Sequence, residues 1–122
     1  MKYIKIASVL TLLMMMVGPV QAHHSFAMFD KARVVTIKGT MGKVEWRNPH
    51  VIMMVNVTDE KGEVTQYTVE CNSPNVMLRN GWKVSTLKVG DPVSADLYPL
   101  RDGRPGGLLD TVTLSNGTKI KG

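Results

Sequence analysis

The chain has 122 residues with 15 basic and 10 acidic side chains, a formal net charge of +5, and a single cysteine, Cys71. This length supports one small domain with a modest core and leaves no room for a second one. The lone cysteine excludes an internal disulfide framework, so the fold must depend on packing alone.

The first 22 residues have the pattern of a secretory signal peptide. Lys2 and Lys5 precede an apolar run over residues 6 to 17, and small residues stand at Val20 and Ala22. This run of 12 residues is shorter than the roughly 17 to 25 residues of a membrane-spanning helix. We therefore expect cleavage after Ala22, export to the periplasm, and no transmembrane anchor in the mature protein.

Cleavage would also lower the net charge of the protein. The mature chain would keep 100 residues and lose two lysines, which lowers the net charge from +5 to +3. Barrels that bind single-stranded nucleic acid combine stacking aromatic residues with a strongly basic groove. The small mature charge and the predicted export both argue against nucleic acid as a partner.

The mature chain divides into a short arm and a β-rich domain. Residues 23 to 32 show no strand alternation and are too few for a stable lone helix, which predicts an N-terminal arm. Residues 33 to 122 alternate apolar and polar side chains between turns of glycine, proline and asparagine. This pattern predicts a single β domain.

The first strand, residues 33 to 46, contains a break in its alternation. Its apolar residues change parity between Ile37 and Val44, and Gly39 and Gly42 lie between them. A period of two changes phase only through an inserted residue, so we predict a glycine bulge or sharp bend there.

The remaining pattern predicts four more strands and one short helix. Ser73 and Pro74 supply an N-cap and a first helical residue, and Gly81 supplies a stop. The expected strands cover residues 50 to 58, 63 to 71, 92 to 100 and 108 to 114. Three strands, a helix and two strands, with a bent first strand, is the order of a small five-stranded OB-like barrel. An antiparallel sheet with one helix is the alternative.

The three histidines, His23, His24 and His50, are candidate metal ligands. Cleavage after Ala22 would make His23 the amino terminus, where one residue offers both an α-amine and an imidazole. A second imidazole from His50 or His24 would complete a three-nitrogen set that suits Cu(II). This arrangement is similar to the histidine brace of copper-dependent polysaccharide monooxygenases and of some copper-resistance proteins.

Strand parity and chain length bear on this metal hypothesis. His50 lies on the opposite face from the apolar row that starts at Val51, so we expect it outside the core. The arm spans at most ~35 Å and must turn back to meet His50, which requires a strongly bent first strand. In the alternative interpretation, His23 and His24 are a polar terminus left by processing, and His50 caps a turn.

A second class of function needs no metal. Trp46 and Asn48 lie in the turn before His50, and Trp82 follows the predicted helix, so a groove at one end of the barrel could hold a partner protein or small ligand. Tryptophan more often serves packing in so small a domain. The methionines, by contrast, are predicted to fill the core, namely Met28, Met41, Met53, Met54 and Met77.

No catalytic constellation is present in the sequence. The serines lack a nucleophile-elbow context, and the chain has neither a paired-carboxylate motif nor a phosphate-binding glycine loop. Arg101 and Arg104, with their neighbouring glycines, predict a solvated hairpin loop. Cys71 shares its face with Tyr67 and Val69, which predicts a buried, unreactive thiol. We therefore expect a non-enzymatic binding protein, with a copper-dependent redox enzyme as the enzymatic alternative.

Six motifs follow one another along the mature chain: His23-His24-Ser25-Phe26, Trp46-Arg47-Asn48-Pro49-His50, Ser73-Pro74-Asn75, Arg79-Asn80-Gly81-Trp82, Leu87-Lys88-Val89-Gly90-Asp91 and Pro99-Leu100-Arg101-Asp102-Gly103. In these motifs the chain resembles DUF6152, a family of small exported proteobacterial proteins of unknown function. The resemblance implies a periplasmic location and a small β-rich fold, and it brings no activity. Cys71 departs from the usual family pattern and is a poor candidate for shared chemistry.

Overall fold

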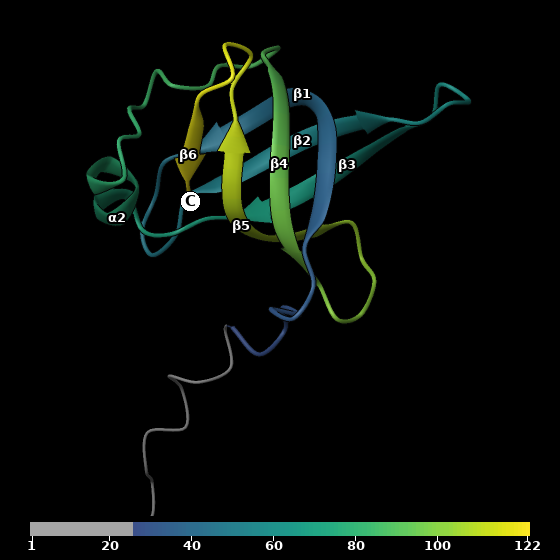
Figure 1. The fold of residues 1–122 in the computed structure, drawn as a ribbon, viewed down its shortest axis with the longest axis horizontal. Helices are drawn as coiled ribbons and strands as arrows, with labels where there is room; N and C mark the ends of the chain where they lie inside the picture. Colours follow the sequence, from purple (N-terminus) through teal and green to yellow (C-terminus); the bar gives the residue numbers. More distant parts are fainter. Residues whose placement is uncertain (1–25) are drawn as a thin grey trace, which may run out of the picture.

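The computed structural model describes residues 26 to 122, so the predicted signal peptide and the candidate ligands His23 and His24 lie outside the described residues. Six strands and one helix occur in the described part (Figure 1): β1 (Val35–Glu45), β2 (Ile52–Thr58), β3 (Val64–Glu70), α2 (Pro74–Arg79), β4 (Pro92–Pro99), β5 (Gly106–Thr113) and β6 (Lys119–Lys121). Each predicted strand is present to within two residues at either end. In residues 26 to 122, no helix has the length and apolar character to cross a membrane.

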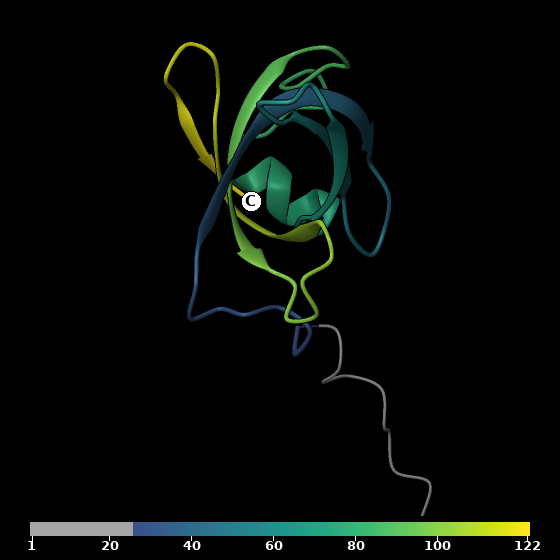
Figure 2. The same ribbon diagram turned by 90° about the vertical axis from the view of Figure 1, so that its right-hand side faces the viewer.

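The first five strands form a closed barrel. Neighbouring strands follow the order β3-β2-β1-β4-β5-β6, and a parallel pairing of β3 with β5 closes the ring. Figure 2 shows the strands surrounding α2, which lies at one end of the barrel. Together with the helix between β3 and β4, this order is that of an OB-type barrel. The predicted fold class is confirmed.

The bend in β1 allows this one strand to pair in both halves of the barrel. Its first half pairs with β4 and its second half with β2, and the register shifts between Met41 and Lys43. A Cβ atom on Gly39 would lie 2.1 Å from the Asn56 carbonyl oxygen, so only glycine permits the close crossing of the two strands. The predicted bulge is therefore present, at Gly42.

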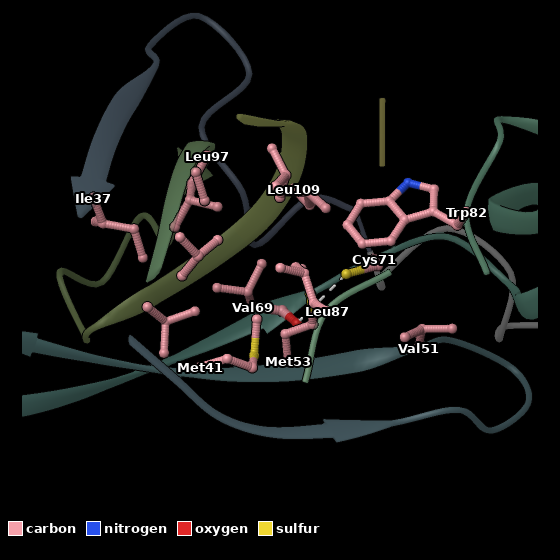
Figure 3. Close-up of a cluster of buried hydrophobic side chains, with 14 of the residues drawn as sticks. Ile37, Met41, Val51, Met53, Val69, Cys71, Trp82, Leu87, Leu97 and Leu109 are labelled. Atoms are coloured by element: carbon pink, nitrogen blue, oxygen red, sulfur yellow. Dashed lines mark hydrogen bonds between the residues drawn. The ribbon is translucent and has the colours of Figure 1, made fainter. Parts of the chain in front are cut away.

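Inward-facing side chains of all five barrel strands form the core (Figure 3). Val51, Met53 and Val55 are fully buried, as the parity of β2 predicts. Met41 and Met77 also fill the core. The predictions for Met28 and Met54 are wrong, because Met28 is 41% exposed on the arm and Met54 lies on the outward face of β2, outside the core cluster.

Cys71 is buried in the same core (Figure 3), as predicted. Burial raises the pKa of its thiol far above the usual range, and the negative charge of Glu70 raises it further. A thiol that stays protonated is a poor nucleophile and a poor metal ligand. Cys71 therefore acts as a small apolar side chain.

The helix α2 begins and ends at the residues predicted for its caps. The Ser73 hydroxyl accepts a hydrogen bond from the Val76 amide at 3.4 Å, and Pro74 occupies the first turn. Gly81 ends the helix with a φ of 98°, a conformation that favours glycine. The chain then places the Trp82 side chain in the core.

The N-terminal arm docks on the barrel beside the end of β4. Phe29 is only 3% exposed and forms a bridge with Leu100. The Asp30 amide donates to the Pro99 carbonyl at 2.8 Å, and the Arg101 amide donates to the Met28 carbonyl at 2.9 Å. These contacts hold the described part of the arm against the loop between β4 and β5 (Figure 1).

Candidate functional site

His50 lies in the loop between β1 and β2, two residues before the first residue of β2. Hydrogen bonds extend the pairing of β2 with β3 past the ends of both strands: the Val51 amide donates to the Asn72 carbonyl at 3.0 Å, and the Cys71 amide donates to the Val51 carbonyl at 2.9 Å. Because neighbouring residues of a strand face opposite sides, a buried Val51 directs His50 outward. The expectation that His50 lies outside the core is confirmed.

The outward-facing His50 meets a carboxylate. Its Nδ1 atom lies 2.5 Å from Glu70 Oε1, and the two side chains are 25% and 24% exposed. A carboxylate this close to Nδ1 favours the tautomer that carries its proton on Nδ1, which leaves the Nε2 lone pair available to a ligand when the ring is neutral. A carboxylate that holds one nitrogen of a histidine is the usual outer partner of a metal-bound imidazole.

Sequence reasoning missed Glu70 as a site residue. The sequence feature that could have identified Glu70 is its position at the end of the third predicted strand, on the polar face with Gln66 and Thr68. What places it beside His50 is the register of the β2 and β3 pair, in which Glu70 is opposite Ile52. That register depends on the whole sheet and is not a local property of either strand.

The arm approaches the same histidine from another direction. The ring centroids of Phe26 and His50 lie 6.2 Å apart with a tilt of 53°, a common geometry for interacting rings. Lys31 Nζ lies 5.1 Å from the centre of the Phe26 ring, a cation–π distance. The described end of the arm therefore lies beside the β1–β2 loop.

An open groove of about 390 Å³ borders the other side of Glu70. Three segments that are far apart in the sequence form it: the arm, the outward face of β2 and β3, and the loop between β4 and β5. Its lining residues are Met28, Phe29, Ile52, Gln66, Thr68, Glu70, Leu100, Arg104, Pro105 and Gly107. Both apolar and hydrogen-bonding side chains line it, as in many sites for small ligands.

The two tryptophans do not share an exposed groove. Trp82 is 3% exposed, and its indole Nε1 donates to the Lys121 carbonyl at 2.8 Å, which makes it a core residue (Figure 3). Trp46 is half-buried against the core, and its Nε1 has no hydrogen-bond partner in the described part of the chain. Asn48 is exposed in the loop. Neither tryptophan lines the groove beside Glu70.

Residues 26 to 122 do not hold a complete metal site by themselves. In this range no three side chains of histidine, cysteine, aspartate or glutamate are grouped closely enough to bind one ion. The described residues supply one oriented imidazole, and any further nitrogen ligands must come from another segment or molecule. His23 and His24, the predicted ligands, precede Phe26 by three and two residues.

Comparison with known families gives one match. A family model described as "Family of unknown function (DUF6152)" matches residues 11 to 110. This range contains all six motifs named above and most of the barrel. No curated protein matches the chain. The function must therefore be argued from the geometry around His50.

Proposed function

The chain belongs to the DUF6152 family of unknown function, and from that premise we propose that it is an exported, non-enzymatic binding protein for copper or another late first-row metal ion. In this proposal the α-amine and imidazole of His23 chelate the ion, His50 supplies the third nitrogen, and His24 assists. The observation that carries the proposal is the contact of Glu70 with His50 Nδ1.

The Glu70 contact supports a ligand role because it prepares the imidazole. A carboxylate that accepts a hydrogen bond from Nδ1–H holds the ring in one orientation and makes Nε2 a stronger metal ligand. The partial exposure of both side chains, 25% and 24%, keeps the site accessible from solvent. A histidine that only capped a turn would not need a carboxylate at this distance.

The position of the arm supports the contribution of the amino end. His23 lies three positions before Phe26, and three extended residues span at most ~11 Å. Because the Phe26 ring centroid is 6.2 Å from that of His50, an amino group at His23 can come within ligand distance of His50. This reach requires only that processing exposes His23.

Copper is the ion that this donor set favours. Three nitrogens in a T-shaped arrangement suit the tetragonal preference of Cu(II), and Cu(II) binds nitrogen ligands most tightly among the divalent first-row ions. The ligands must be deprotonated to bind, so metal affinity should fall as the pH drops below about 6 to 7.

The test compares three forms of the protein. Mass spectrometry of exported material first identifies its amino-terminal residue. Cu(II) titrations then compare protein that starts at His23, the same protein with one added N-terminal residue, and His50→Ala. We expect each change to lower Cu(II) affinity at least tenfold, with Asn48→Ala in the same loop as an unchanged control. Equal affinities for all four proteins would contradict the proposal.

A second candidate function, metal-independent binding of a small ligand or partner, is supported by the groove of about 390 Å³ beside Glu70. A ligand with both apolar and polar groups fits its mixed lining. Thr68→Trp would fill the groove from its β3 wall. We expect this change to abolish retention of such a ligand in a screen of periplasmic metabolites and to leave Cu(II) affinity unchanged. Retention by the Thr68→Trp protein would exclude the groove.

A further inference from the structure

Arg101 connects the barrel to the arm by two hydrogen bonds. Its backbone amide donates to the Met28 carbonyl at 2.9 Å, and its side-chain Nε donates to the Ala27 carbonyl at 3.0 Å. One residue of the β4–β5 loop therefore binds two successive carbonyl groups of a segment 74 residues away. Ala27 is adjacent to Phe26, whose ring contacts His50.

The neighbouring Arg104 shows that this is not a general property of the loop. Both arginines are exposed, and the sequence predicts a solvated role for both. Arg104 donates to Asp102 of its own loop through its backbone amide at 3.0 Å and through Nε at 2.7 Å, and these two hydrogen bonds lower the pKa of the Asp102 carboxyl. Arg101 instead uses its side chain on the arm. Within this loop, Arg104 therefore stabilises the loop, and Arg101 binds the arm.

We propose that Arg101 is a positioning residue that holds Ala27 and Phe26 of the arm beside His50, and that it thereby sets the metal affinity of the proposed site. This inference rests on the proposed function. A ligand on a free segment binds weakly, because ordering that segment costs conformational entropy at the moment of binding. A hydrogen bond that orders the arm beforehand removes part of this cost and raises the effective concentration of the amino-terminal nitrogens at His50.

The other contacts of the arm limit the effect of removing the Arg101 side chain. Phe29 stays buried, and the backbone hydrogen bonds of Asp30 with Pro99 and of Arg101 with Met28 remain after Arg101→Ala. The arm should therefore stay docked at Phe29 and loosen only at Ala27 and Phe26. This predicts a change in metal affinity with the fold intact.

The experiment is a double-mutant cycle read out by Cu(II) affinity. Arg101→Ala and Arg104→Ala are each made in protein that starts at His23 and in protein with one added N-terminal residue. We expect Arg101→Ala to lower affinity about five- to tenfold in the first background and to have no effect in the second, where the amino end no longer chelates. Arg104→Ala should have no effect in either, and Arg101→Lys should restore part of the affinity.

In the affinity measurements, two results would overturn the proposal: equal effects of Arg101→Ala in both backgrounds, or equal effects of Arg101→Ala and Arg104→Ala. Hydrogen exchange of the arm separates this proposal from the metal proposal. Without metal, Arg101→Ala should speed exchange of the Phe29 amide, which donates to the Phe26 carbonyl at 3.2 Å, and leave exchange of the Asp30 amide unchanged. If hydrogen exchange of the Phe29 amide is unchanged in Arg101→Ala, Arg101 has no positioning role, whether or not the protein binds copper. Faster exchange with no copper binding by any form supports the anchoring and rejects the metal site.

Discussion

The part of the barrel next to α2 (the α2 side) and the part where the N-terminal arm docks (the arm side) both contain family motifs. Their polar side chains, however, differ in what they bind. On the α2 side, Trp82 binds the Lys121 carbonyl and the Asn72 side chain binds the Gly122 carbonyl, each at 2.8 Å. These bonds join parts of the chain to one another around a buried indole. On the arm side, His50 and Glu70 form a half-exposed pair next to an open groove.

This difference separates residues that maintain the fold from residues that are available for chemistry. A polar group that binds a buried backbone carbonyl contributes to stability and has no capacity left for a ligand. A half-exposed imidazole with one nitrogen held by a carboxylate keeps its second nitrogen available. We therefore expect substitutions on the α2 side to change stability, and substitutions on the arm side to change metal affinity.

The largest effect is expected from Trp82→Ala. Removing a buried indole leaves a cavity and should lower the free energy of unfolding by about 3 to 5 kcal/mol, measured by urea denaturation. Trp82→Phe keeps most of the packing and loses only the hydrogen bond to Lys121, so it should cost less and leave Cu(II) affinity unchanged. A selective loss of Cu(II) affinity in Trp82→Phe would break the division between the two sides.

Glu70→Ala is the matching change on the arm side. Loss of the carboxylate that orients His50 should lower Cu(II) affinity about 10- to 100-fold in titrations. The free energy of unfolding should change by about 0.5 kcal/mol or less, because the side chain is partly exposed. Glu70→Gln, which keeps an acceptor oxygen, should have a smaller effect on affinity. A lower unfolding midpoint with unchanged affinity would assign Glu70 to stability instead.

Asn72→Ala tests the α2 side with a smaller change. Its side-chain amide donates to the Gly122 carbonyl, and its loss should lower the free energy of unfolding by about 1 kcal/mol in thermal or urea unfolding. Asn75→Ala, at an exposed position of α2, is the matched control and should have almost no effect. Equal stabilities of the two variants would show that the hydrogen bond contributes nothing.

Tyr98 lies where the two sides meet, in a pocket lined by both Phe26 and Gly122, and it should show the smallest effect. Its hydroxyl donates to Asp110 at 3.0 Å, and this bond, with the negative charge of Asp110, raises the pKa of Tyr98. The raised pKa means that its contribution to stability is present at neutral pH and is lost as the pH rises through that value.

An ultraviolet titration of folded protein should therefore lose the tyrosine ionisation with the raised pKa in Tyr98→Phe. Unfolding of the variant should lose part of its dependence on alkaline pH. Stability at neutral pH should change little on either side of the molecule. A Tyr98→Phe protein with the parent titration curve would contradict the role of Asp110.

Local patterns were sufficient for most of the fold. Alternation along the second predicted strand indicates the buried row of Val51, Met53 and Val55. The parity change in β1 predicts a bulge or bend in the segment with Gly39 and Gly42, and the register shift occurs at Gly42. Ser73 and Gly81 marked the ends of α2. These predictions succeed because each depends on residues only a few positions apart, where backbone geometry alone decides which way a side chain points.

Predictions that needed distant partners were less complete. The sequence indicated that His50 faces outward but not that Glu70 would meet it, and it treated Arg101 and Arg104 alike although only Arg101 binds the arm. Trp82 was assigned to a possible surface and is buried, since its environment depends on the β6 strand that covers it. Export, the mature amino end and the metal itself stay predictions.

The sequence by itself determined the order of strands and helix, the bend in β1 and the outward direction of His50, because periodicity and turn residues act locally. Only the tertiary structure decided which side chains became neighbours. Closure of the barrel between β3 and β5, the register of β2 against β3, and docking of the arm at Phe29 together bring Phe26, His50 and Glu70 to one place. The physical reason is that these contacts come from cooperative packing of the whole sheet, which no single segment specifies.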